Sequence, residues 1–441
     1  MRSILKHLKQ IGPGAIVASA TIGAGETVLA VRMGAWGGYE LLWLILLAAI
    51  CKSFLTLYLL GRYSAVSGEA VADRLIELPG PRGWLLWILL ILEGLVAPLV
   101  FVVIAVPCGQ LMSNILASIG VMISYKWLAL GFVSLAIIVG MTQSYQTLER
   151  SQIVVCLILL VGTVTATLLT GPDVKEIFRG FFRFGHVPPY PDWLPSKISD
   201  RSQLLELASV FGYAGSIPMN YIVYSNWVLL KGWTVRRNGS SRPDFSQALG
   251  PLRWDVGFNV VLVLLVTAAF TIAGAAILNP LHRIPNGFDL LTEQAHIFAR
   301  ISPAMIWLYY VTILTALWGT LNALPEIYAR GAHSFLRQLL SKGKELEYRK
   351  VMNIFGGLML GLTWVFIWTE TTPIFMIDLV ALFSTNIGVG LVCLAALWLD
   401  RQLPSQDRVS RWIWWATIAA AAVINLMSLI AAREVIGKYI G

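Results

Sequence analysis

The sequence of 441 residues is poor in charge, since Asp, Glu, Lys and Arg together make up 13% of it. Hydrophobic residues account for 57%, and the mean hydropathy is +0.72. A soluble domain of ordinary composition carries about 25% charged residues. The shortage of charge therefore excludes an ordinary soluble protein and predicts a chain that lies in a lipid bilayer.

Cysteine and enzyme motifs are also scarce. The four cysteines, Cys51, Cys108, Cys156 and Cys393, all fall within apolar runs. Neither a disulfide framework nor a CxxC metal site can be built from them. The sequence contains no P-loop, nucleophile elbow, HExxH motif or Gly-rich dinucleotide signature. We therefore expect no enzymatic activity and no cofactor.

Long apolar runs are what the chain has in abundance, each near the roughly 20 residues that a helix needs to cross a bilayer. About eleven spans are predicted, near 11–31, 39–60, 84–107, 127–142, 151–170, 204–230, 256–278, 303–328, 351–368, 374–399 and 411–432. The basic start resembles a secretory signal, but dense apolar sequence continues after it, so we predict that it leads into the first span.

The distribution of positive charge predicts the orientation. With the N-terminus inside, most of the 33 lysines and arginines fall in cytoplasmic segments. The sequence thus predicts a multi-pass protein of the cell (inner) membrane with a cytoplasmic N-terminus and an extracytoplasmic C-terminus. The net charge of +9 follows from this bias and indicates no nucleic-acid partner. The expected partners are the bilayer and a small solute or divalent cation; no oligomeric state is predicted.

Two spans are interrupted at corresponding points. The first contains Gly23-Ala24-Gly25-Glu26, and the sixth contains Gly215-Ser216-Ile217-Pro218-Met219-Asn220. A bilayer offers no water to the backbone groups that such breaks set free, so breaks occur where they line a cavity or bind something. The two breaks together predict a transporter.

The order of the spans predicts a single transmembrane transporter domain, 1–441, built from two repeats that each begin with a broken helix. We predict a first inverted repeat over 11–170, an extracytoplasmic loop over 171–203, a second inverted repeat over 204–400, and an extra C-terminal helix within 401–441. Within the second repeat, the polar segment 231–255 is predicted to be a flexible cytoplasmic linker.

Several motifs resemble those of the Nramp family of divalent-metal transporters. They are Gly12-Pro13-Gly14, the break at 23–26, Gly38-Tyr39-Glu40-Leu41-Leu42-Trp43, and Pro218-X-Asn220. With the length and the order of spans, the resemblance covers nearly the whole chain. It implies an all-α integral membrane protein of about 11 helices with a LeuT-like fold, in which helices 1 and 6 are broken around a midplane site and access alternates between the two sides.

The site departs from the pattern of the family. Where the family reads Asp-Pro-Gly-Asn in helix 1, a glycine, Gly23, replaces the ligand aspartate, and Glu26 replaces the ligand asparagine. Where the family reads Met-Pro-His-Asn in helix 6, Ile217 replaces the sulfur ligand. Thioether ligation suits soft transition metals. We therefore do not expect a manganese or iron site of the family type.

The proton pathway of the family is reduced as well. Helix 3 keeps Glu93 but has Val100 and Val103 where the family carries two further carboxylates. In helix 6, Tyr224 replaces a histidine, and its phenol is neutral under ordinary conditions. Proton coupling by the family route is not expected. Similar losses mark the Nramp-related magnesium transporters.

The candidate site residues follow from the breaks, from the resemblance and from buried charge, because an ionisable group inside a membrane is a functional candidate by default. The predicted substrate-binding residues are Glu26, Gly23, Asn220, Ile217, Met219, Asn386 and Tyr224, with Glu26 and Asn220 as metal ligands. The structural alternatives are a hydrogen bond of Glu26 to freed backbone N–H groups and capping of the second break by Asn220.

Lys52 and Glu93 are predicted coupling or gating residues. Lys52 lies roughly 15 Å along its helix from Arg62, too deep for its ammonium to reach the interface. We expect it to pair with Glu26 or Glu93 as a built-in cation, or else to line a water-filled vestibule. Glu93 has the alternative role of bridging helices.

Three functions stay open, of which the first is favoured. In the first, a hard divalent cation such as Mg²⁺ is carried partly hydrated and without proton coupling, held by Glu26, Asn220 and backbone carbonyls. In the second, a small organic solute or cation contacts Glu26 through a positive group and Ile217 with Met219 through an apolar group. In the third, the chain is a sensor or scaffold that keeps the fold without transport.

Overall fold

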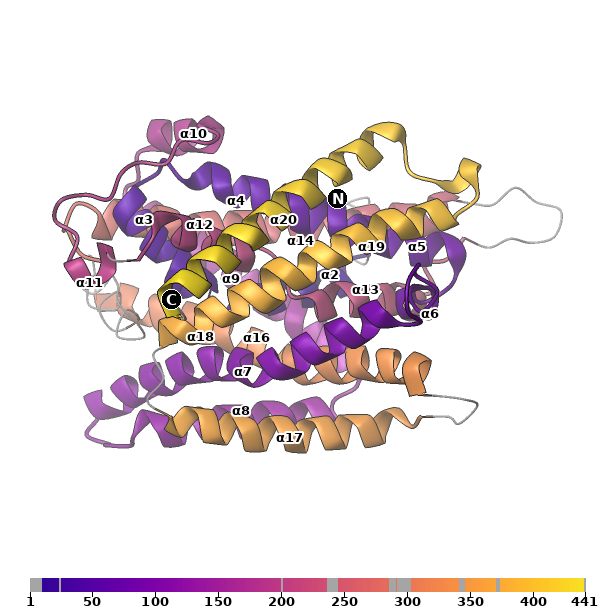
Figure 1. Cartoon of the computed structure of the whole chain (residues 1–441). Helices are drawn as coiled ribbons and strands as arrows, with labels where there is room; N and C mark the ends of the chain where they lie inside the picture. The colour runs from indigo at the N-terminus through magenta and orange to yellow at the C-terminus, as the bar shows by residue number, and fades with distance from the viewer. Residues whose placement is uncertain are drawn as a thin grey trace, which may run out of the picture.

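The computed structural model describes residues 10–23, 25–199, 201–235, 245–284, 291, 303–340, 346–369 and 373–439. Within these ranges all regular structure is helical. Long helices run alongside one another, and α7 (Trp84–Ser118), α8 (Tyr125–Thr142) and α17 (Tyr348–Trp368) pack together on one side of the bundle (Figure 1). This architecture confirms the predicted all-α class.

Nine helices in the described ranges are long and apolar enough to cross a membrane, or ten if the bent pair at the start counts as one span. Besides α7, α8 and α17, the spans comprise α4 (Leu42–Ala48) with η2 (Ala49–Thr56) and α5 (Leu57–Ser67), α9 (Tyr145–Leu169), α14 (Phe245–Ala273) with η3 (Gly274–Leu278), α16 (Pro303–Leu340), α18 (Pro373–Val380) with η5 (Ala381–Gly388) and α19 (Val389–Gln402), and α20 (Arg411–Tyr439). The remaining predicted span, 204–230, is divided into α12 (Gln203–Tyr213) and α13 (Pro218–Leu230).

Some helices run past their predicted bounds. Helix α7 continues to Ser118 instead of ending near residue 107, and α16 continues to Leu340 instead of ending near residue 328. Helix α14 begins at Phe245, so the prediction of a flexible linker is wrong for residues 245–255. The helices are longer than predicted because an apolar run indicates only the part of a helix that lies in hydrocarbon, and the polar ends of the helix extend beyond it.

Both predicted breaks are present. The first separates α2 (Pro13–Thr21) from the π-helical η1 (Gly25–Ala30) and α3 (Val31–Gly37), and the two parts are bent by 49°. The second separates α12 from α13. Helix α12 ends at Tyr213, and Pro218 stands in the first turn of α13, where the missing backbone N–H of a proline costs no intrahelical hydrogen bond.

Close glycine contacts fix the second half of the first span against α14 and η3. A Cβ atom on Gly34 of α3 would meet the backbone carbonyl of Thr271, and one on Gly274 of η3 would meet the carbonyl of Val31. Reciprocal contacts of small residues let membrane helices approach closely. The position of η1, and of Glu26 within it, follows from this packing.

The polar loop after α9 covers one end of the bundle. It contains α10 (Val174–Phe182) and the short α11 (Ser196–Ser199), and α10 lies at the edge of the molecule near α4 (Figure 1). The indole of Trp43 donates a hydrogen bond to the carbonyl of His186 (3.0 Å), and Arg183 pairs with Glu40 (2.6 Å). The loop is therefore tied to the start of the second span.

Candidate functional site

A narrow cavity lies between the two breaks. It is lined by both breaks and by α7, α16, α18 and η5, through Ala20, Thr21, Gly23, Val100, Val103, Ile104, Tyr213, Gly215, Ser216, Ile217, Thr320, Leu324, Val380 and Thr385. The space open to the centre of a water-sized sphere is about 30 Å³, and one water needs about 10–15 Å³ by the same measure. In this conformation the cavity has room for a small ion or a couple of waters.

Three hydroxyl groups of the cavity lining already donate their protons to backbone carbonyls. The hydroxyl of Thr21 donates to the carbonyl of Val17 (2.7 Å), and that of Thr320 lies 2.8 Å from the carbonyl oxygen of Ile22. The hydroxyl of Thr385 donates to a carbonyl one turn back in its own helix. A hydroxyl that donates its proton keeps lone pairs as an acceptor. The lining thus offers neutral oxygen donors to a cation.

Glu26 is buried in η1, directly after the first break. Its Oε2 accepts a hydrogen bond from the backbone N–H of Gly23 (2.9 Å), while its Oε1 is buried and has no hydrogen-bond partner in the described ranges. Gly23 lines the cavity, whereas Glu26 itself does not in this conformation. Glu26 therefore makes the predicted hydrogen bond to a backbone N–H group freed by the break. Its second carboxylate oxygen has no hydrogen-bond partner in the described ranges.

At the second break, Ile217 lines the cavity, and the side-chain amide of Asn220 donates to the hydroxyl of Ser216. The structure places the other two predicted helix-6 contacts elsewhere. Met219 lies against Gly331 of α16, and the phenol of Tyr224 donates to Asp255 (3.0 Å). The correction has a simple cause: α13 begins at Pro218, so its successive residues turn away from the cavity at helical spacing.

Asn386 also points away from the cavity. Its amide nitrogen donates to the carbonyls of Ala208 (3.0 Å) and Ala381 (2.9 Å), and so ties η5 to α12. The preceding residue, Thr385, is the one that lines the cavity. In this conformation the predicted segment of helix 10 thus reaches the cavity through Thr385 and not through Asn386.

Lys52 is fully buried in the π-helical η2. Its Nζ donates to the backbone carbonyls of Phe211 (3.3 Å), Gly212 and Thr385 (2.9 Å). Within the described ranges no direct ion pair joins Lys52 to Glu26 or to Glu93, but Glu26 lies close enough for a longer-range electrostatic attraction to the ammonium group. The direct partners of this charge are backbone carbonyls.

Glu93 is buried in α7 next to the hydroxyls of Ser384 and Tyr328, and it does not line the cavity. The part of α7 that reaches the cavity carries Val100 and Val103. Val100 and Val103, which stand where the family carries carboxylates, therefore form an apolar part of the cavity wall.

Buried acids that the sequence analysis did not select hold the broken helices. Asp255 of α14 accepts hydrogen bonds from the backbone N–H groups of Gly12 and Gly14 (2.7 Å each) at the start of α2. Asp378 of α18 binds Arg201 through two hydrogen bonds (2.6 and 2.7 Å). Asp378 could have been found by its charge inside a predicted span, whereas Asp255 fell in the predicted linker.

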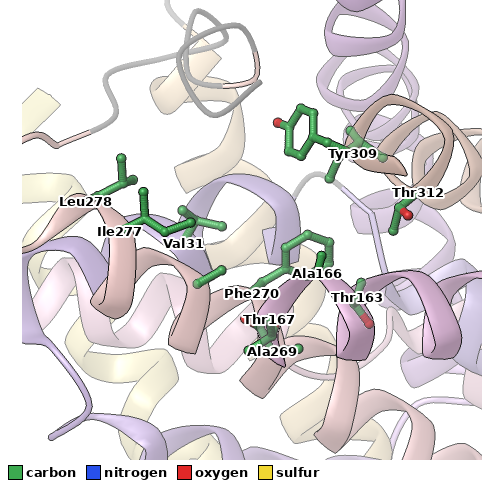
Figure 2. A pocket seen from close by; sticks show the side chains of 12 residues that line it. Val31, Thr163, Ala166, Thr167, Ala269, Phe270, Ile277, Leu278, Tyr309 and Thr312 are labelled. Atoms are coloured by element: carbon green, nitrogen blue, oxygen red, sulfur yellow. Dashed lines mark hydrogen bonds between the residues drawn. The ribbon is translucent and has the colours of Figure 1, made fainter. Parts of the chain in front are cut away.

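A second cavity, shown in Figure 2, lies between α9, α14 with η3, and α16, and its accessible lining is apolar. The hydroxyls of Thr163 and Thr167 in its wall donate to the carbonyls of Leu159 (2.6 Å) and Ala269 (3.1 Å). This cavity touches neither the Gly23 nor the Ile217 segment. We therefore place the candidate site in the cavity between the breaks, where polar groups converge.

No group of three or more His, Cys, Asp or Glu side chains that could hold a metal ion is found in the described ranges. A cation in the cavity would depend on hydroxyl and carbonyl oxygens with Glu26 as the nearby carboxylate. Two broken spans with a small cavity between their breaks define a membrane transporter of the LeuT-like architecture.

The chain belongs to the Nramp family. The family model described as "Natural resistance-associated macrophage protein-like" matches residues 14–432. The divalent metal cation transporter MntH of Pediococcus pentosaceus is 21% identical over 437 residues, which cover 97% of this chain and 91% of that relative. Metal transporter Nramp3 of Oryza sativa subsp. japonica is 28% identical over 175 residues, covering 39% of this chain and 30% of the relative.

Solved structures show the same fold. The manganese transporter of Eremococcus coleocola, in complex with an aromatic bis-isothiourea substituted compound, superposes with a TM-score of 0.73 at 16% identity, covering 100% of this chain and 90% of that one. Mhp1, a nucleobase-cation-symport-1 family transporter with bromovinylhydantoin bound, gives a TM-score of 0.58 at 14% identity, covering 97% and 93%. The LeuT-like fold predicted from the sequence is thus confirmed.

Proposed function

We propose that this protein transports a hard divalent cation such as Mg²⁺, partly hydrated and without proton coupling. A divalent cation is the substrate class that the MntH relative carries by its description. The observation that supports the hard ion is the donor set of the cavity, which consists of oxygen: Ile217 stands at the sulfur position, and Met219 lies outside. Mg²⁺ prefers oxygen ligands and keeps several waters, whereas thioether ligands suit softer metals.

The charge for such an ion comes from Glu26. Its Oε1 lacks a hydrogen-bond partner in the described ranges, and a buried polar atom without a partner is costly until something binds it. A rotation of the side chain away from the N–H of Gly23 would bring the carboxylate toward the cavity that Gly23 lines. The hydroxyls of Thr21 and Thr320 would hold the remaining waters of the ion.

The absence of proton coupling is supported by α7. Val100 and Val103 form the wall of the cavity there, and Glu93 lies apart from it beside Tyr328 and Ser384. A valine side chain carries no group that could pass a proton between the cavity and Glu93. The cation would then move down its own electrochemical gradient.

We also infer the orientation from the charges, with the N-terminus in the cytoplasm, the C-terminus outside and the protein in the cell (inner) membrane. The loop with α10 and α11 would then cover the outer end of the bundle. The alternative substrate, a small organic solute, would require a wider cavity than the about 30 Å³ present in this conformation. A sensor or scaffold would bind the cation without moving it.

Thermal unfolding of the purified protein with Mg²⁺, Mn²⁺, Ca²⁺, amino acids and amines tests the site. We expect Mg²⁺ to raise the melting temperature of the wild type and to have no effect on Glu26→Gln, because the amide cannot supply the negative charge. Glu176→Gln, which alters an exposed carboxylate of α10 paired with Arg179, serves as control and should respond like the wild type. Mg²⁺ stabilisation that persists in Glu26→Gln, or no response to any divalent cation, would contradict the proposal.

A further inference from the structure

The surroundings of Lys52 form a complete cage for one positive charge. An ammonium group has three donors, and Nζ meets three backbone carbonyl oxygens, those of Phe211, Gly212 and Thr385. The ring of Phe211 adds a cation–π contact, with its centroid 5.6 Å from Nζ. All ligands of this charge are therefore neutral oxygens or an aromatic face, and none is a carboxylate.

The cage stands at the end of a half-helix. Phe211 and Gly212 lie in the last turn of α12, which ends at Tyr213 before the second break. The last carbonyls of a helix have no intrahelical partner and carry the negative end of its dipole. In transporters with broken helices, such half-helix ends and unwound carbonyls coordinate monovalent ions. Lys52 thus holds its ammonium where an ion from solution would otherwise fit.

The corresponding end of α2 shows that a charge is not needed to satisfy such carbonyls. There the hydroxyl of Thr320 lies 2.9 Å from the carbonyl oxygen of Ser19 and 2.8 Å from that of Ile22. The first break thus has a neutral group with a single proton to donate, whereas at the second break the protein buries a lysine charge, which costs several kcal/mol unless it is well compensated. The charge itself therefore has a role beyond capping.

The cage borders the substrate cavity. Gly215 lines that cavity, and a Cβ atom on it would collide with the side chain of Lys52, so the stem of the lysine passes directly behind the cavity wall. Thr385 contributes its carbonyl to the cage and also lines the cavity. A charge in the cage consequently acts on whatever occupies the cavity.

We propose that this cage is a monovalent-cation site that the protein fills with its own ammonium group. The tethered charge replaces a cation that would otherwise be taken from solution, so the site has no ion requirement while Lys52 is present. A small monovalent cation, such as Na⁺, K⁺, ammonium or methylammonium, binds only when the side chain is removed. This inference goes beyond the proposed function and is independent of which substrate is carried.

Chemical rescue of Lys52→Ala tests the inference. We expect the variant to unfold at a lower temperature than the wild type in N-methylglucamine chloride. At equal ionic strength, at least one of the chlorides of Na⁺, K⁺, ammonium and methylammonium should restore at least half of that loss, with saturation. The wild type should show no such cation-specific shift. Nor should Lys350→Ala, which removes an exposed lysine paired with Glu347 (3.2 Å), because water solvates the exposed carboxylate that is left.

Lys52→Met provides a second comparison, since its side chain fills the space without a charge and should be destabilised with no rescue. If Lys52→Ala cannot be isolated in N-methylglucamine, the yield of folded protein prepared in each of the small cations is compared with that in N-methylglucamine. Recovery in any of the small cations supports the proposal. Failure of all four to restore stability or yield, or equal recovery in N-methylglucamine, would overturn it.

Discussion

Replacement of Asp378 by alanine is expected to lower the free energy of unfolding by about 3–5 kcal/mol, because it removes the carboxylate that holds the buried guanidinium of Arg201 through two hydrogen bonds. Arg201 and Asp378 are both buried and joined by hydrogen bonds of 2.6 and 2.7 Å. Glu206 stays 3.3 Å from Nε of Arg201, but it also pairs with Arg32 at 2.5 Å, so one carboxylate would have to serve two guanidinium groups. Ser209 loses a hydrogen bond as well.

The matched control is Glu176→Ala, which removes an exposed ion pair with Arg179. Such surface pairs contribute about 0–1 kcal/mol. Thermal or denaturant unfolding in the same detergent measures both variants. If Asp378→Ala is no less stable than Glu176→Ala, then the buried network does not hold α12 and α18 together as described.

Replacement of Asp255 by alanine is expected to release the start of the first span. Its carboxylate accepts from the N–H groups of Gly12 and Gly14 at 2.7 Å and from the phenol of Tyr224 at 3.0 Å. A buried donor that loses its acceptor costs about 1–3 kcal/mol. Because two backbone donors and a phenol are affected, we expect a large loss of stability and faster amide hydrogen exchange at Gly12 and Gly14.

Asp255→Asn should show a smaller effect, since the amide oxygen still accepts one hydrogen bond. Asp173→Ala is the control, because Asp173 also caps a helix, accepting from the N–H groups of Lys175 and Glu176, but does so in the exposed loop. Loss of such a cap costs about 0.5–2 kcal/mol. Unchanged exchange at Gly12 and Gly14 in Asp255→Ala would show that the carboxylate does not hold α2.

These two acids explain how the breaks stay defined. Asp255 fixes α2 before the first break. Arg32 of α3, Glu206 of α12 and Asp378 of α18 are joined through ion pairs that include Arg201, so the part after the first break is tied to the part before the second. The short unwound segments lie between anchored half-helices. A binding cavity between the breaks can then keep its shape although its own lining makes few strong contacts.

The breaks and the positions of most spans could be predicted because glycine, proline and apolar runs act locally. The direction of individual side chains could not. Glu26, Lys52 and Thr385 all lie in π-helical segments, η1, η2 and η5. The wider π turn shifts the phase of the residues, so helical periodicity does not indicate which of them face the cavity.

The hydrogen-bond partners of Lys52 could not be predicted from the sequence for another reason. The Lys52 ammonium group donates its hydrogen bonds to backbone carbonyls. Because every residue has a backbone carbonyl, the sequence does not indicate which of them lie near Lys52. Likewise, Asp255 lies in a stretch whose arginines, serines and glycine resemble a linker, although the residues from Phe245 onward are helical. The polar residues at the start of α14 therefore have the composition of a loop although they are helical.

The central claim is tested most directly by measuring Mg²⁺ entry into proteoliposomes together with the internal pH. We predict Mg²⁺ entry down its gradient in the wild type and in Glu176→Gln, no accompanying acidification, no response to an imposed pH gradient, and loss of entry in Glu26→Gln. Mg²⁺ entry accompanied by proportional acidification, entry that Glu26→Gln leaves unchanged, or no Mg²⁺ entry at all would contradict the account.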